Sequence, residues 1–354
     1  MFDSDFLCDF WENLLSVIKQ FVFDGRLRFC SSLVLIAIPA AAAFGQTCTT
    51  GSDMEPATKA ALLSAGQRYF DLLARGDSAS LKQSAIPSLA SDFSAIEATV
   101  KDNQPALSGA KATPRSPFVL EATGTAAQAK ADFYCGVFGA SGQTSSSAVF
   151  YLNSLPPGKY GVVILDTAAS KGAYTVSFIL QLLGSDWKLG GLYIRAAQTV
   201  GHDSEWFVTR ARTYQSKGQL HNAWFYFLEA RSLVSPMPFM STAVTDKLYD
   251  ESQKSQPTDL PAEGKTADLP SGATTYKLTD LFPEVVGNDL DLIVKYQVAS
   301  VADTNQAYQS NAAVIKALVT KYPELRDAFA GVVARAVDPS GHDYGTMLAM
   351  KDIK

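Results

Sequence analysis

The feature that most constrains the fold is a run of five segments in the middle of the chain, each rich in aromatic and β-branched residues. Short turns separate these segments, among them Pro156-Pro157-Gly158 and Gly184-Ser185-Asp186. A connection this short cannot return over a sheet, so the strands that it joins run antiparallel. The pattern therefore predicts an antiparallel meander with strands at residues 131–138, 148–152, 160–166, 174–183 and 187–195.

Before this run, the hydrophobic residues repeat at helical spacing. Pro56 suits a first helical turn, and apolar residues then recur on one face up to Leu73, which predicts a helix over residues 56–75. Another helix is expected over residues 89–102 and a loop over residues 103–116. Helices followed by a meander indicate the α+β class, with the helices packed on one face of a curved antiparallel sheet.

Two stretches of this region resemble the nuclear-transport-factor-2-like superfamily. They are YFDLLARGDSASL at residues 69–81 and FILQLLGSDWKLGGLYI at residues 178–194. The resemblance covers residues 55–199 and implies a cone of helices and a bent sheet around an apolar pocket. It implies no single function, because that superfamily includes enzymes, ligand binders and protein-contact domains.

Residues 203–254 return to helical spacing and resemble a single tetratricopeptide motif, which implies an αα-hairpin. The matching positions are Phe207, Ala211, Tyr214, Gly218, Ala223, Phe227 and Ala230. A single repeat leaves apolar surface on its outer faces. The contact between its two helices is too small to bury Trp206, Trp224 and Tyr226 as well. These three residues are expected to contact another domain or a partner. Because the cone-like domain is the nearest cover, the hairpin is predicted to dock there as one rigid unit.

The rest of the chain is predicted to be a linker over residues 255–275 and a small α+β domain over residues 276–354. Prolines, glycines and small polar residues fill the linker, which is expected to act as a hinge. Beyond it, the pattern is strand, helix, strand and strand, a βαββ arrangement whose last two strands are joined by Asp338-Pro339-Ser340-Gly341.

The first 45 residues predict export. Arg26 and Arg28 precede an apolar run at residues 29–43, and Ala43-Phe44-Gly45 places small residues where a signal peptidase cuts. The apolar run is shorter than the roughly 20 residues that span a bilayer. The mature chain is therefore expected to begin near Gln46, in the periplasm or outside the cell, with the membrane involved only through the signal segment.

Residues 1–23 precede this signal, and their apolar residues follow an amphipathic helical pattern. They could form a helix on the membrane surface. The alternative, which we favour, is that translation starts after them. Cys8 and Cys30 would be removed, which leaves Cys48 and Cys135 in an oxidising compartment, where cysteines can pair. Cys48 is expected on a mobile terminus, and Cys135 in an apolar strand where a buried free thiol is common. The two are therefore predicted not to form a disulfide.

Composition and motifs argue against several function classes. The formal net charge is -5 and charged residues make up 18% of the chain, so nothing favours nucleic-acid binding. His202, His221 and His342 have no second His or Cys at metal-ligand spacing. The sequence also has no phosphate-binding loop and no nucleophile elbow. Neither a metal nor a cofactor is expected.

The candidate site residues lie in the meander. Tyr134, Tyr151, Trp187 and Tyr193 could line a ligand pocket, although aromatic residues are also typical of an ordinary sheet core. Asp132 shares strand parity with Tyr134, and a carboxylate among aromatic rings could transfer protons. The competing interpretation, which we favour, places Asp132 at the start of a strand at the solvent edge.

The pattern as a whole predicts an exported, non-catalytic binding or scaffolding protein. Its partner would be another envelope protein or a small apolar ligand. The alternative is a small-molecule lyase or isomerase of the cone type that uses a pocket carboxylate such as Asp132.

Overall fold

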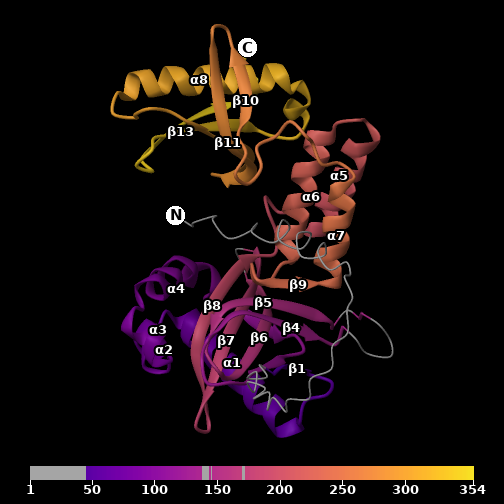
Figure 1. Ribbon diagram of the computed structural model, residues 1–354, viewed down its shortest axis with the longest axis vertical. Coiled ribbons are helices and arrows are strands. Elements are labelled where there is room, and N and C mark those ends of the chain that lie inside the picture. Colours follow the sequence, from indigo (N-terminus) through magenta and orange to yellow (C-terminus); the bar gives the residue numbers. More distant parts are fainter. Residues whose placement is uncertain (1–44, 138–142, 145, 170–171) are drawn as a thin grey trace, which may run out of the picture.

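The computed structural model describes residues 45–137, 143–144, 146–169 and 172–354. The chain belongs to the α+β class, as predicted. Its elements gather into an N-terminal unit (residues 46–196), a helical segment (residues 204–253) and a C-terminal unit (residues 267–352) (Figure 1). The predicted signal segment and the amphipathic stretch before it lie outside the described residues.

The N-terminal unit is built around a six-stranded antiparallel sheet. Its strands are β1 (Gln46–Thr50), β2 (Lys111–Pro114), β3 (Phe118–Ala122), β6 (Gly158–Ala169), β7 (Gly172–Leu183) and β8 (Asp186–Ala196). They pair in the order β1-β3-β6-β7-β8, and β2 pairs with another part of β6. The last three strands confirm the prediction. The first three were missed, because strands of four or five residues are too short to show a clear alternation.

Helices cover one face of this sheet. They are α1 (Pro56–Arg75), α2 (Ser78–Gln83), α3 (Pro87–Ser91) and α4 (Ser94–Leu107). The first helix matches its prediction; the Glu55 side chain caps it by accepting hydrogen bonds from the backbone N–H groups of Ala57 and Thr58. The helix predicted over residues 89–102 is split between α3 and α4. The predicted loop over residues 103–116 also holds the end of α4 and all of β2.

A close approach fixes α1 on the sheet. Gly66 lies so near β6 that a Cβ atom there would be 2.5 Å from a methyl carbon of Val163. Beside it, Leu62 and Tyr69 of α1 are fully buried with Phe178 of β7. The packing of α1 therefore depends on the missing side chain of Gly66 as much as on its apolar neighbours.

The opposite face of the six-stranded sheet is covered by a second, three-stranded sheet. Its strands are β4 (Gln128–Cys135), β5 (Ala148–Leu155) and β9 (Met240–Thr242), paired antiparallel in the order β4-β5-β9. The predicted single meander is wrong here, because β5 and β6 are consecutive in the chain but belong to different sheets. Pro156 and Pro157 separate the two strands, and proline cannot donate the hydrogen bonds that would continue the pairing.

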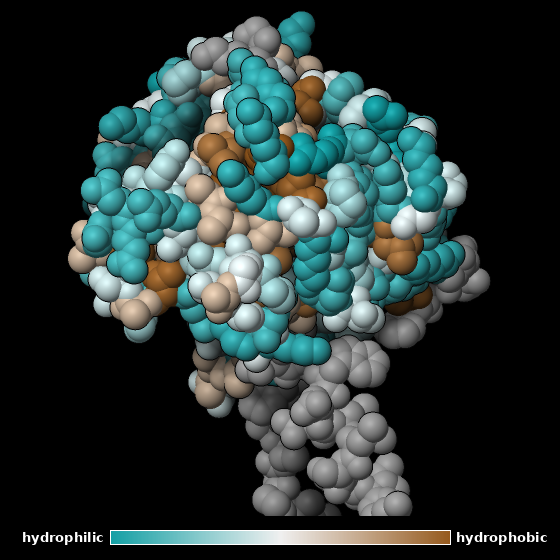
Figure 2. Space-filling view, turned by 90° about the horizontal axis from the view of Figure 1, so that it is seen from above, coloured by the Kyte–Doolittle hydropathy of each residue, from teal (hydrophilic) through white to brown (hydrophobic). Residues whose placement is uncertain are grey.

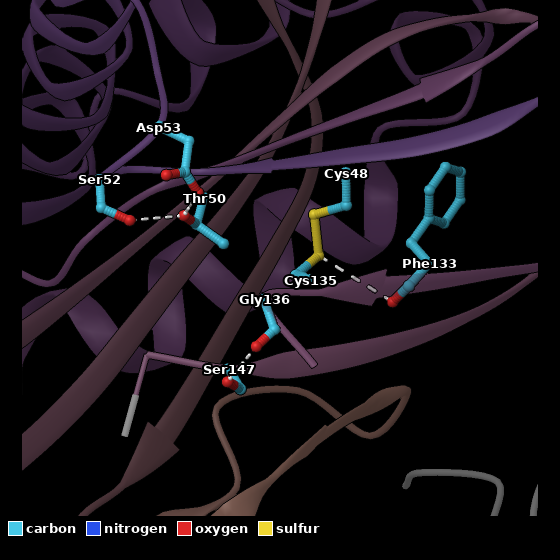
Figure 3. Close-up of a disulfide and its surroundings, with 8 residues drawn as sticks. All are labelled: Cys48, Thr50, Ser52, Asp53, Phe133, Cys135, Gly136 and Ser147. Atoms are coloured by element: carbon cyan, nitrogen blue, oxygen red, sulfur yellow. Dashed lines mark hydrogen bonds between the residues drawn. A yellow bond between two sulfur atoms is a disulfide. The ribbon is translucent and has the colours of Figure 1, made fainter. Parts of the chain in front are cut away.

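A disulfide between Cys48 of β1 and Cys135 of β4 joins the two sheets, and its Cα atoms are 5.1 Å apart (Figure 3). Beside it, the Ser147 hydroxyl donates a hydrogen bond to the Gly136 carbonyl. The prediction of free thiols is wrong, because β1 is paired along its whole length with β3 and holds Cys48 in place.

The helical segment holds three helices, of which the first two pack against each other. It consists of α5 (Ser204–Ser216), α6 (Leu220–Val234) and α7 (Ala243–Gln253). Gly218 turns the chain between α5 and α6 with a φ of 76°. The apolar motif positions, among them Phe207, Ala223 and Phe227, are buried.

The C-terminal unit is a five-stranded sheet with one long helix. Its elements are β10 (Ala267–Ser271), β11 (Thr274–Val286), β12 (Asp289–Gln297), α8 (Thr304–Lys321), η1 (Pro323–Asp327), β13 (Gly331–Val337), β14 (Asp343–Ala349) and η2 (Met350–Asp352). The strands follow chain order, and β12 and β13 are parallel across α8. The predicted strand-helix-strand-strand series is present, but β10 and β11 precede it, and β10 lies inside the range predicted as linker.

The helical segment shares its core with the C-terminal unit. One buried cluster contains Phe225 and Tyr226 of α6 together with Phe329, which precedes β13. Trp206 and Trp224 pack against this same cluster. The expectation that the cone-like domain covers these two indoles is therefore wrong. The rings that pack on Trp206 are those of His202, Phe207 and Tyr226, which belong to the helical segment and to the turn before it.

Candidate functional site

The structure brings three of the predicted site residues together on the outer face of the β4–β5 sheet. Asp132 of β4 lies directly opposite Tyr151 of β5, and Tyr134 opposes the neighbouring Val149. Tyr134 and Tyr151 are 48% and 49% exposed. Two large aromatic side chains exposed on one sheet face are typical of a contact surface.

Acidic groups surround this pair of tyrosines. Burial raises the pKa of the Tyr151 phenol, and the nearby Tyr134, Asp246 and Asp132 raise it further. Asp246 belongs to α7, where its carboxylate accepts a hydrogen bond of 2.5 Å from the Ser241 hydroxyl. The face therefore combines two phenol side chains with two carboxyl groups.

Asp132 lies in the middle of β4 and not at the start of a strand, contrary to the interpretation that we favoured. Its backbone N–H donates a hydrogen bond of 3.0 Å to the side-chain oxygen of Gln46. The residue is partly exposed, so water reaches the face that it shares with Tyr134 and Tyr151.

Trp187 and Tyr193 lie elsewhere, on opposite faces of the six-stranded sheet. Trp187 is buried beneath the helices, whereas Tyr193 packs on the other side, with its ring 5.2 Å from that of Phe239. An extra residue, Gly190, interrupts the pairing of β7 with β8 and reverses the alternation between them. The four aromatic residues predicted to line one pocket are thus divided among three surfaces. The Gly190-Gly191 pair was the sequence signal for this bulge.

Two hollows in the part of the chain that the structure describes are lined mainly by polar residues and are open to solvent. The larger, of about 350 Å³, follows one side of α7 and is lined by Asp246, Asp250, Lys247 and Lys254 among others. The smaller, of about 200 Å³, includes Asp259, Lys265 and Lys321. Neither hollow is lined by the predicted pocket aromatics.

Of the three contact residues predicted on the hairpin, Tyr226 bonds to the C-terminal unit, and the neighbouring Tyr214 and Asn222 do so as well. The Tyr226 hydroxyl donates a hydrogen bond of 2.7 Å to the Ala328 carbonyl, and the Tyr214 hydroxyl donates one of 2.7 Å to the Asp327 carbonyl. The Asn222 amide donates to the Glu324 carbonyl at 2.5 Å. Trp206 stacks on His202 with ring centroids 3.7 Å apart.

His221 is the residue at this interface that the sequence analysis passed over. Its Nδ1 lies 2.7 Å from Oε1 of Glu324, and its Nε2 lies 3.0 Å from Oδ1 of Asp259. The two carboxylates are 38 and 103 residues away along the chain. No local pattern could have indicated this cluster, because neither partner stands at a recognisable spacing.

At the junction with the N-terminal unit, the carboxyl group of Glu229 in α6 accepts a short hydrogen bond from the Thr199 hydroxyl. Burial raises the pKa of this carboxyl, although the bond from Thr199 opposes the effect and the charge of Glu284 adds to it. The connection after β8, helix α6 and strand β11 thus lie near one carboxyl group.

Within the described ranges, no group of three or more His, Cys, Asp and Glu side chains is arranged to hold a metal ion. Among the helices that the structure describes, none is both long and apolar enough to cross a membrane. The end of the molecule shown in Figure 2 is mostly hydrophilic, and the hydrophobic side chains on it form small patches separated by polar ones. Comparison with known proteins finds no matching family model, no matching curated protein and no matching solved structure.

Proposed function

We propose that the chain is an exported binding or scaffolding protein whose helical segment holds two sheet units in a fixed relation. The observation that carries this proposal is that the segment between α5 and α7 contributes to the cores on both sides. Met237 and Met240 join the core of Phe133, between the two sheets of the N-terminal unit. Phe225 and Tyr226 join the core of the C-terminal unit. A helical segment that is packed into a core at each end would keep the two sheet units, and the surfaces that they expose, at a fixed distance from each other.

Two features support export with signal cleavage near Gly45. Gln46 is the first residue of β1, and its side chain bonds both Gln128 and the backbone of Asp132. A mature chain beginning there would keep every strand of the N-terminal unit. The Cys48–Cys135 disulfide is typical of the oxidising compartments outside the cytoplasm. We place the protein in the periplasm or outside the cell.

The outer face of the β4–β5 sheet is the contact surface that we propose, and its partner is another envelope protein. Tyrosine is enriched in protein interfaces because it buries a large ring and keeps a hydroxyl for hydrogen bonding. The alternative enzyme would need Asp132 in a site that excludes water. Its position on an open face favours binding over proton transfer.

Photocrosslinking in the exporting cell tests this proposal. A crosslinking amino acid at Tyr151 is compared with one at Leu183, which is 39% exposed beside the β7–β8 turn. We expect one defined protein adduct from position 151 and none from position 183. Equal adducts at both positions, or none at 151, would contradict the proposed surface. Turnover of a small molecule that Asp132→Asn abolishes would favour the lyase or isomerase.

A further inference from the structure

His221 sits where three stretches of chain meet. It belongs to the first turn of α6, and its two carboxylate partners come from the connection before β10 and from η1. The imidazole also lies 4.2 Å from the ring of Tyr322, centroid to centroid. Only 16% of the His221 side chain is exposed, whereas Asp259 and Glu324 are 45% and 21% exposed.

The geometry identifies the protonation state that this cluster requires. A neutral imidazole donates from one ring nitrogen and presents a lone pair at the other, whereas an imidazolium donates from both. At His221, each nitrogen faces a carboxylate oxygen within hydrogen-bond distance. A neutral ring would therefore direct a lone pair at one carboxylate, and only the charged ring satisfies both contacts.

We infer that His221 is a proton-dependent clamp, which holds the C-terminal unit against the helical segment and loosens when the imidazole loses its proton. This inference goes beyond the proposed binding role and does not depend on it. The clamp is a local conformational device: its opening would loosen η1 and the connection before β10, while the shared core keeps the units together.

Charged groups from several elements lie near the clamp. From the connection before β10 come Asp259 and Lys265, and from α8 comes Lys321, all of which line one hollow together with Asp268 of β10. From η1 comes Glu324. Lys321 lies over the ring of Tyr322 at 4.8 Å, and the Tyr322 hydroxyl donates to the Asp259 carbonyl at 3.3 Å. Burial first, and then the hydrogen bond with Asp259 and its charge, raises the pKa of the Tyr322 phenol, so this phenol stays neutral over the pH range of the test.

The direction of the pH dependence follows from these partners. Burial alone would raise the pKa of Asp259, but hydrogen bonds from His221 and Tyr322 hold it below its ordinary value. The stabilisation that the Asp259 carboxylate gives to the clamp is therefore complete above the ordinary aspartate pKa of about 3.9. It is lost only as the pH falls through the lowered pKa of Asp259. At the other limit, the ring that bonds both carboxylates must carry its proton. The clamp is therefore closed while the imidazole is protonated, and it opens as rising pH removes that proton.

Hydrogen exchange of the full mature chain tests the clamp. Protection of η1 and of residues 256–262 is measured between about pH 5.5 and about pH 8.5, corrected for intrinsic exchange at each pH and referred to β6. We expect protection to fall about tenfold across this range, the size of one charge-assisted hydrogen bond. His221→Gln should stay at the lower protection level at every pH, because a neutral amide does not titrate.

His342→Gln is the matched control, because the side chain of His342 is 77% exposed in the β13–β14 turn. It should keep the wild-type profile. If His221→Gln fails to fold, Asp259→Asn replaces it, since an amide there can donate to a neutral imidazole and should reduce the pH response. If protection in the wild-type protein did not change with pH, the clamp would be overturned. It would also be overturned if the change with pH were the same as in the wild type in His221→Gln, or in Asp259→Asn where that variant replaces it.

Discussion

The two ends of the helical segment are attached by different balances of contacts. Toward the N-terminal unit, Met237 and Met240 enter the core, but β9 also pairs with β5 over three residues, and the Tyr151 backbone N–H donates to the Phe239 carbonyl at 2.9 Å. Toward the C-terminal unit, side chains of α5 and α6 donate hydrogen bonds to backbone carbonyls, and aromatic side chains from both regions pack in one core. Backbone pairing tolerates many substitutions, whereas a side-chain interface depends on particular residues. Single substitutions should therefore affect the C-terminal attachment far more than the N-terminal one.

The largest effect is expected for Phe225→Ala. Phe225 is fully buried, and its ring centroid lies 5.9 Å from that of Phe329. Removing a buried phenylalanine ring costs about 3–5 kcal/mol, because a cavity remains. Urea unfolding followed by hydrogen exchange should show lower stability in α6 and the C-terminal unit, with β6 unchanged. Phe133→Ala, in the core between the two N-terminal sheets, should give the reverse pattern. Equal losses in both units from either variant would contradict separate attachments.

Removing the disulfide comes next. The Cys48→Ser, Cys135→Ser double variant opens a crosslink that spans 87 residues. The loss should be about 2–5 kcal/mol in the N-terminal unit, because the unfolded chain regains freedom. Differential scanning calorimetry with and without reductant measures it: reductant should shift the wild-type N-terminal transition and leave the variant unchanged. A wild-type transition that reductant does not move would contradict this assignment.

These two predictions also show what the sequence could not reveal. The helices and long strands follow from local periodicity, and the buried positions of the hairpin follow from its motif spacing. Cys48 lies in QTCTT, a polar stretch without alternation, which becomes a strand only because β3 pairs with it. Tertiary pairing of this kind leaves no local signal.

The candidate site was predictable only in part, for the same reason. The parity of Asp132 and Tyr134 placed them on one face, and the structure adds Tyr151. Trp187 and Tyr193 were grouped with them because strict alternation was assumed across β8, and the single extra residue Gly190 divides them. The docking of the helical segment on the N-terminal unit was predicted in part, since Met237, Met240 and β9 join that unit, but the C-terminal unit was wrongly expected to be hinged apart from it. The carbonyls that satisfy Tyr214 and Tyr226 lie about a hundred residues further along the chain.

A smaller effect is expected for Tyr226→Phe. The substitution keeps the ring and removes the donor to the Ala328 carbonyl, so a buried acceptor loses its partner. Such a loss costs about 1–3 kcal/mol. Chemical denaturation of the C-terminal unit measures it. Tyr308→Phe is the control, because Tyr308 is half exposed on α8 and should change nothing. Equal stabilities of the two variants would show that the interface does not rely on this hydroxyl.

Glu229 predicts a pH dependence for the junction near Thr199. Since burial, the largest effect, raises the pKa of its carboxyl, the folded state holds this proton more tightly than the unfolded state does. Its contribution to stability is complete below the ordinary glutamate value of about 4.3 and is lost as the pH rises through the raised pKa. Glu229→Gln should flatten this part of the stability profile. Thermal unfolding from acid to neutral pH measures it, with Glu205→Gln on the exposed side of α5 as the control. A profile that Glu229→Gln leaves unchanged would contradict the burial of this carboxyl.

The smallest effect is expected for Ser177→Ala, a substitution at the N-terminal attachment of the helical segment. The Ser177 hydroxyl of β7 donates to the Pro236 carbonyl, and this is a side-chain bond at the N-terminal attachment. Its length of 3.4 Å is at the weak end of hydrogen bonding. Ser177→Ala should therefore cost less than about 1 kcal/mol, since the β5–β9 pairing keeps the connection in place. Hydrogen exchange of β9 measures the effect alongside Tyr226→Phe. If Ser177→Ala opened β9 more than Tyr226→Phe loosens η1, the N-terminal attachment would depend on side chains after all, and the two ends of the helical segment would not differ in kind.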